Sequence, residues 1–193
     1  MRKIIYLIIC FFISASWSQK QIPGHDQTKT ILLYNAKIIS GTGSIIEDGF
    51  FGFSDGKIDH LSISKPQKVY DLEIDLKGKH IYPGFIALNS TLGLVEISAV
   101  RASDDEREMG TYNPNIRSII AYNAESRIVE TMRLNGVLIG QITPRGGVIS
   151  GSSSVVQFDA WNWEDATIKY DEGMHVNWPN PYRRPSRWSS GSR

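Results

Sequence analysis

The stretch that decides the fold covers residues 77–94 and reads KGKHIYPGFIALNSTLGL. Within it, a short apolar run at residues 85–88 follows the Pro83-Gly84 break and ends in three small polar residues, Asn89, Ser90 and Thr91. Apolar runs of this length, bounded by turn residues, are typical of buried strands in parallel sheets. We therefore expect an α/β fold in which this strand is buried and its carboxyl end opens into a site.

The same stretch resembles a known family. Tyr-Pro-Gly-Phe-Ile at residues 82–86, with the polar triplet and Leu-Gly after it, is similar to the first barrel strand of the metal-dependent amidohydrolases, in particular their imidazolonepropionase-like branch. In that family the strand ends in His-x-His, which supplies two metal ligands, and the corresponding positions here are Asn89 and Thr91. The resemblance implies a (β/α)₈ barrel behind a small β-sandwich. It also implies hydrolysis of carbon–nitrogen bonds other than peptide bonds, with zinc or another divalent metal.

The replacement of both histidines bears on the chemistry. Neutral oxygens, such as those of Asn89 and Thr91, are poor ligands for transition metals. The family's metal lowers the pKa of water from about 15.7 to about 7, which is worth on the order of 12 kcal/mol. A hydrogen bond contributes only about 1 kcal/mol. We therefore predict no cofactor and no catalytic residue in this chain. The triplet 89–91 then either lines a substrate pocket or simply caps the strand.

The first eighteen residues have the pattern of a secretory signal peptide. Arg2 and Lys3 precede an apolar core at residues 4–13, and small residues at 16 and 18 suit cleavage. This predicts export to a periplasm or to the exterior. The only cysteine, Cys10, lies in this segment, so the mature chain is expected to have no disulfide. The net charge of +1 gives no sign of a nucleic-acid partner.

After this segment, residues 19–29 are expected to be a mobile lead-in, and residues 30–78 part of a β-sandwich. Apolar strands are predicted at residues 31–34 and 36–39. Asp55-Gly56 predicts a hairpin between the strands on either side. Alternation of apolar and charged residues at 69–76 predicts one more half-buried strand.

Residues 79–178 are predicted to be a partial, incomplete TIM-like barrel. A polar loop at 98–111 is expected to be solvated. Asn113-Pro114 then predicts the start of a helix whose apolar stripe runs to Met132, as one helix or two, and strands follow at 137–143 and 155–158. A strand, a helix and a strand in succession indicate a parallel pair. The link at 134–137 also resembles the family's link into its second barrel strand.

The second polar stretch contains Arg145, two glycines and the serine-rich residues 150–154. Its backbone N–H groups could hold an anion beside Arg145, or it could be a flexible connection. Trp161 and Trp163 could bind sugars, or pack against the outside of the barrel. His175, between two apolar residues, is expected in the core. Residues 179–193 are expected to be disordered or truncated.

A (β/α)₈ barrel takes about 250 residues, more than this chain offers after its first strands. The chain is therefore predicted to be a fragment: an exported amidohydrolase-family protein, inactive as it stands. A second hypothesis is a non-catalytic binding or scaffold protein on the same frame, which pairs with a homologous amidohydrolase subunit. A third is an aromatic glycan-binding module. Candidate pocket residues for a small-molecule ligand are Asn89, Ser90, Thr91 and Arg145.

Overall fold

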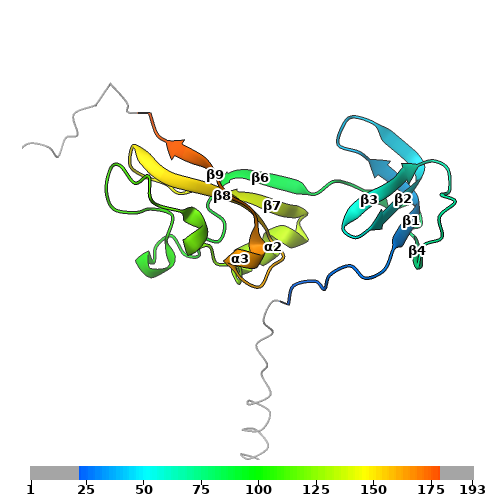
Figure 1. Cartoon of the computed structure of the whole chain (residues 1–193), viewed down its shortest axis with the longest axis horizontal. Coiled ribbons are helices and arrows are strands. Elements are labelled where there is room, and N and C mark those ends of the chain that lie inside the picture. Colours follow the sequence, from blue (N-terminus) through cyan, green and yellow to red (C-terminus); the bar gives the residue numbers. More distant parts are fainter. Residues whose placement is uncertain (1–21, 179–193) are drawn as a thin grey trace, which may run out of the picture.

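The computed structural model describes residues 22–178, so the predicted signal peptide and the predicted tail at 179–193 lie outside the described residues. Two β-sheets make up this part of the chain, and they are joined by a short link at residues 82–84 (Figure 1). A search of residues 22–178 finds no helix with the length and hydropathy needed to cross a bilayer.

The first sheet has the strand order β3-β2-β1-β4, and a short β5 also pairs with β1. Its strands are β1 (Ile31–Ile39), β2 (Ile45–Ser54), β3 (Lys57–Ser62), β4 (Leu72–Asp75) and β5 (His80–Ile81). The two short strands predicted at 31–39 form one strand, which kinks at Asn35 with a φ of 55°. The sequence predicts that the second unit begins at residue 79, but β5 belongs to the first sheet.

The hairpin predicted around Asp55-Gly56 is confirmed, because β2 and β3 pair antiparallel on either side of it. Both turn residues have positive φ, 50° and 69°, which matches the right-handed twist of the flanking strands.

The strand predicted at 69–76 is shorter and less buried than expected. Only β4 is extended, its four residues are exposed, and Tyr70 just before it is buried instead.

Asp59 on β3 fastens the loop at residues 63–71 to the sheet. Its carboxylate accepts hydrogen bonds from Lys68 Nζ at 2.5 Å, Tyr70 OH at 2.6 Å and Ser54 Oγ at 2.8 Å. These donors, Lys68 first and then Tyr70, lower the pKa of Asp59 to about 2. Burial, together with the Asp59 carboxylate, raises the pKa of Tyr70 to about 12.

We expect acid to weaken the first sheet through Asp59. Its folded-state pKa lies below the ordinary value of 3.8, so its contribution is present above about pH 4 and is lost as the pH falls toward 2. Urea unfolding followed by circular dichroism between pH 6 and 2 measures this loss. Asp59→Asn should flatten the curve in that window, whereas Glu47→Gln, an exposed acid on β2, should not. Equal acid sensitivity of Asp59→Asn and the parent chain would contradict the assignment.

The second sheet has the order β6-β7-β8-β9. Its strands are β6 (Phe85–Ser90), β7 (Val137–Ile142), β8 (Ile149–Gln157) and β9 (Thr167–Val176), with short helices η1 (Arg101–Ser103), η2 (Ser118–Ala121), α2 (Arg127–Leu134) and α3 (Trp163–Ala166). The parallel pair β6–β7 was predicted and is confirmed. The strands after β7 run antiparallel instead of continuing a series of βα units, so the described residues contain a single such unit.

The helix predicted to start at Asn113 is wrong. Tyr112 and Arg117 form bridges to Ile149 and Ser152 of β8, and residues 114–115 between them form a turn. The Asn113 N–H donates to Ile149 O. Only η2 and α2 are helical in this region. The α-helix begins after Ser126, whose Oγ accepts from the N–H groups of the first turn as an N-cap.

The flexible connection considered for residues 150–154 is also wrong, because these residues form the middle of β8 and are buried. Serine can occupy such a position when its hydroxyl finds a partner. Ser150 Oγ donates to Gly146 O, Ser153 Oγ donates to Glu172, and Ser154 Oγ accepts from Asp171 N. The third strand predicted at 155–158 is therefore the end of this longer, antiparallel strand.

The core of the second unit lies between its sheet and the segments η2, α2 and α3. Its buried members include Leu94, Ile119, Tyr122, Val129, Ile142, Val156, Phe158 and Ala166. β6 does not share this burial, although the sequence predicted a buried strand. Phe85, Ile86 and Leu88 are 68%, 59% and 73% exposed. β6 is also an edge strand: β7 pairs with one side of it, and no described strand pairs with the other.

The described part of the lead-in, residues 22–29, contacts both sheets. Pro23 is buried, and the Gly24 N–H donates to Asp159 Oδ2 at 3.2 Å in the second unit. Gln27 Nε2 donates to Phe53 O at 3.1 Å in the first. The segment therefore spans the two sheets as a second connection beside residues 82–84 (Figure 1).

Candidate functional site

The candidate site lies where β6 and β7 end. Asn89, near the end of β6, has a φ of 52°, and Arg145 follows β7 after Pro144. The Arg145 guanidinium donates from Nη1 to Asn89 Oδ1 and from Nη2 to Asn89 O, each at 2.6 Å. The Arg145 N–H is itself fixed by Glu106 O. The structure thus brings together two residues that the sequence singled out from segments far apart in the chain.

Ser90 and Thr91 act locally. Ser90 O accepts from Thr143 N at 2.8 Å, and Ser90 Oγ accepts from Leu92 N at 3.2 Å. Thr91 O accepts from Leu94 N at 2.9 Å and closes a turn. Of the two interpretations of this triplet, these contacts favour a capped strand end for Ser90 and Thr91, and leave Asn89 as the residue that joins a wider network.

The wider network crosses all four strands of the second sheet, and sequence reasoning missed most of it. The Asn89 N–H donates to Gln141 Oε1 at 2.9 Å, and Gln141 Nε2 donates to Glu172. Ser153 Oγ also donates to Glu172, at 2.8 Å, and lies 2.8 Å from His175 Nε2. The only signal in the sequence was a glutamine inside an apolar strand, and its partners could not be read without the antiparallel pairing of β8 and β9.

Hydrogen bonds and burial shift the pKa values of two groups in this network, Glu172 and His175. Donation from Gln141 and then Ser153 lowers the pKa of Glu172, so the carboxylate stays ionised. Partial burial lowers the pKa of His175, an effect that Glu172 opposes and Arg145 supports. His175 was expected in the core; the structure places it half-buried on β9 beside this network.

The Ser153, His175 and Glu172 contacts do not form a nucleophilic triad. A nucleophilic serine donates its proton to the histidine, whereas Ser153 donates to the carboxylate. Ser153 is also fully buried, so no substrate carbonyl could reach its oxygen. The arrangement is therefore a static hydrogen-bond network that holds β7, β8 and β9 in register.

The residues at the end of β6 do not fit a catalytic metal. Both oxygens that Asn89 could offer already accept from a guanidinium at 2.6 Å, so they are engaged by a cation. No cluster of three or more His, Cys, Asp or Glu residues that could hold a metal occurs within residues 22–178. We derive no step through a metal for this chain.

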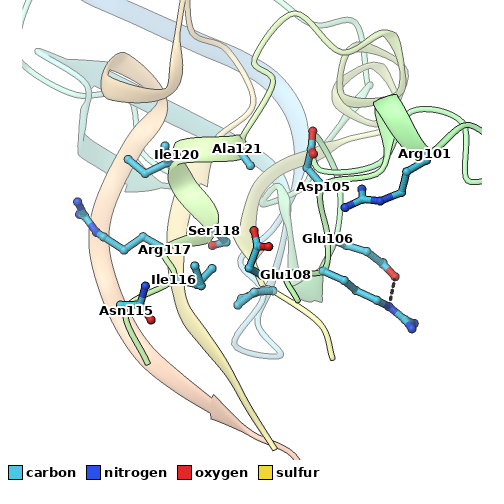
Figure 2. A pocket seen from close by; sticks show the side chains of 12 residues that line it. Arg101, Asp105, Glu106, Glu108, Asn115, Ile116, Arg117, Ser118, Ile120 and Ala121 are labelled. Carbon is cyan, nitrogen blue, oxygen red and sulfur yellow. Dashed lines mark hydrogen bonds and ion pairs between the residues drawn. The ribbon is translucent and has the colours of Figure 1, made fainter. Parts of the chain in front are cut away.

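A pocket of about 360 Å³ lies next to this network (Figure 2). One wall is the segment 101–108 and the other is residues 115–121, which include η2. Its lining residues are Arg101, Asp105, Glu106, Arg107, Glu108, Asn115, Ile116, Arg117, Ser118, Ile120, Ala121 and Pro144. The sequence predicted a solvated loop at 98–111 and no site in it. The opposing wall at 115–121 follows soon after in the chain, but it falls where a helix was wrongly predicted.

The aromatic residues considered for sugar binding divide between two roles. Trp163 packs against the core and meets the Tyr170 ring edge-on, at 6.5 Å between ring centroids. Trp161 is 58% exposed. Since Trp163 is committed to the interior, the pair offers no support for a stacking platform.

Comparison with known proteins complements this geometry. No protein-family model matches the chain, and no curated protein matches it. Among solved structures, a crystal structure of an amidohydrolase from Thermotoga maritima MSB8 resembles it with a TM-score of 0.71 and 24% sequence identity. The match covers 78% of this chain and 39% of that one, so the chain spans well under half of that protein's length. The fold of this chain is therefore similar to part of an amidohydrolase structure.

Proposed function

We propose that this chain is an exported protein of the amidohydrolase family, corresponding to the N-terminal portion of the family's architecture. We further propose that as it stands it binds rather than hydrolyses. Two facts support the family: the fold likeness to the Thermotoga protein and the stretch at residues 82–93. The loss of metal chemistry rests on one observation, the double hydrogen bond from Arg145 to Asn89.

The physical reason is electrostatic. A guanidinium stays protonated in proteins, so Arg145 carries a full positive charge at any working pH. A divalent ion about 4 Å from it would meet a repulsion on the order of 8 kcal/mol at an effective dielectric constant of about 20. Asn89 offers no charge in return. A metal ion at the end of β6 would therefore first have to displace Arg145.

The test is metal stoichiometry on the full chain, measured by elemental analysis after dialysis against zinc, together with assays on amide and cyclic amide substrates. We expect far less than one zinc per chain and no hydrolysis. The triple variant Asn89→His, Thr91→His, Arg145→Ala restores two imidazoles and removes the cation, so it should bind zinc more tightly than the parent. One zinc per parent chain with hydrolytic activity would refute the proposal.

A scaffold role beside a homologous amidohydrolase subunit is the second candidate, and the exposed apolar edge strand β6 favours it. Unpaired strand edges with large apolar side chains are sites where another chain can add. Light scattering on a mixture of this chain and an amidohydrolase from the same source would test it. A molar mass equal to the sum of the two chains, lost with Leu88→Lys, supports the role. Molar masses of the two separate proteins contradict it.

A further inference from the structure

The pocket of Figure 2 has a rigid base and two chemically different walls. Its base includes Pro144, which is buried, and Ser118, which is 3% exposed and whose Oγ donates to Ile142 O at 2.7 Å. The η2 side adds the apolar side chains of Ile116 and Ile120. A volume of about 360 Å³ lies within the range of small-molecule sites.

The charges that line this pocket are not balanced once existing ion pairs are removed. Arg117 is paired with Asp171, and Arg107 with Glu106, so these two arginines are already neutralised. Of the charged residues that remain, Asp105 and Glu108 are acidic and Arg101 is basic. Neither Asp105 nor Glu108 forms an ion pair within residues 22–178.

Among the lining residues, Arg101 is the one basic residue outside an ion pair in the described part of the chain, and its guanidinium donates to the backbone nearby. Its Nη1 donates to Asp104 O, in the same short turn. Glu108 accepts only from the neighbouring Met109 N–H, at 2.9 Å, through one of its two oxygens. Two carboxylates and one guanidinium therefore remain outside ion pairs among the described residues, so the residual charge of the pocket is negative and a cation is the complementary charge.

We propose that this pocket binds a small organic cation, with an ammonium or guanidinium head between Asp105 and Glu108 and a short apolar stem against Ile116 and Ile120. Charge-assisted hydrogen bonds to carboxylates are the strongest polar contacts available to such a head. The apolar wall favours a carbon chain over a bare inorganic ion. The inference depends on the pocket alone, so it stands or falls independently of the family assignment and of the metal result.

Isothermal titration of the full chain with agmatine, a dication with an ammonium and a guanidinium on a four-carbon stem, tests the proposal, and butyrate serves as an anion with a similar carbon stem. We expect agmatine to bind and butyrate not to bind. Asp105→Asn and Glu108→Gln should each weaken agmatine binding by about tenfold, the loss of one charge-assisted contact. Both residues are exposed, so these variants should unfold at the temperature of the parent chain. Glu47→Gln, an exposed acid in the first sheet, is the control and should leave binding unchanged.

Added salt should also weaken agmatine binding, because exposed charge contacts are screened. Three results would each overturn the proposal: no agmatine binding, butyrate binding of equal strength, or agmatine binding that is unchanged in both Asp105→Asn and Glu108→Gln. A zinc-free chain that nevertheless binds agmatine would separate this site from the question of hydrolysis.

Discussion

Replacing Phe158 with alanine is expected to destabilise the second unit by about 3–5 kcal/mol, because it empties the centre of the core. Phe158 is 1% exposed, and its ring lies over Gly140 so closely that a Cβ there would come within 2.5 Å of it. Urea unfolding followed by tryptophan fluorescence measures the loss. The described tryptophans, Trp161, Trp163 and Trp178, all belong to this unit.

The matched control is Phe85→Ala. It removes the same kind of side chain from the same unit, but at a position that is 68% exposed. Substitutions at such positions change stability by about 0.5 kcal/mol or little more. Similar losses for Phe158→Ala and Phe85→Ala would mean that the core is not where the structure places it.

The second large effect is expected for Gly93→Ala, in the turn that follows the candidate site. Gly93 has a φ of +76°, and a Cβ on it would lie 2.5 Å from the ring of the buried Tyr122. The left-handed conformation costs about 1–2 kcal/mol for a residue with a Cβ. Overpacking a core costs about 1–3 kcal/mol more. We expect a combined loss of about 2–5 kcal/mol in thermal or urea unfolding, followed by circular dichroism.

Gly78→Ala separates the two contributions. Gly78 has the same φ, +76°, but a Cβ there would meet nothing within 4 Å. It should therefore show only the backbone cost, about 1–2 kcal/mol. If Gly93→Ala were no worse than Gly78→Ala, Tyr122 would not be packed against the turn as described.

Local signals predicted the elements that depend on neighbouring residues. Asp55-Gly56 predicted the hairpin because both turn positions need positive φ. The parallel pair of β6 and β7 followed from an apolar strand, a helical stripe and a second apolar strand. The link between the two sheets falls at the predicted break at Pro83-Gly84.

Elements that depend on distant partners were mispredicted. Asn113-Pro114 has the local chemistry of a helix start, but residues 114–115 form a turn between two bridges to β8. Tertiary contacts of this kind override weak propensities. The serines at 150–154 look like a loop because serine is usually exposed. Here partners on β9 and in the loop before β8 satisfy their hydroxyl groups.

The sequence predicted only some residues of the candidate site. Asn89 and Arg145 each stood out beside a strand end, and the structure joins them. Gln141 on β7 belongs to the same network, but its partner Glu172 lies on β9, whose antiparallel pairing with β8 no local pattern reveals. The pocket beside them was also missed, because its second wall, residues 115–121, falls within the helix that was wrongly predicted from Asn113.

Gly151 on β8 does not line that pocket, but it packs against the backbone of Ile116, which does. A Cβ at this position would lie 2.5 Å from Ile116 O, and the Ser152 N–H donates to the same oxygen at 2.8 Å. The backbone of Ile116 therefore packs directly on β8 at Gly151, where no side chain comes between them. A natural or engineered substitution at Gly151 would push on the Ile116 backbone and change the shape of the pocket. The ligand preference of the pocket would then change although its lining residues stay the same.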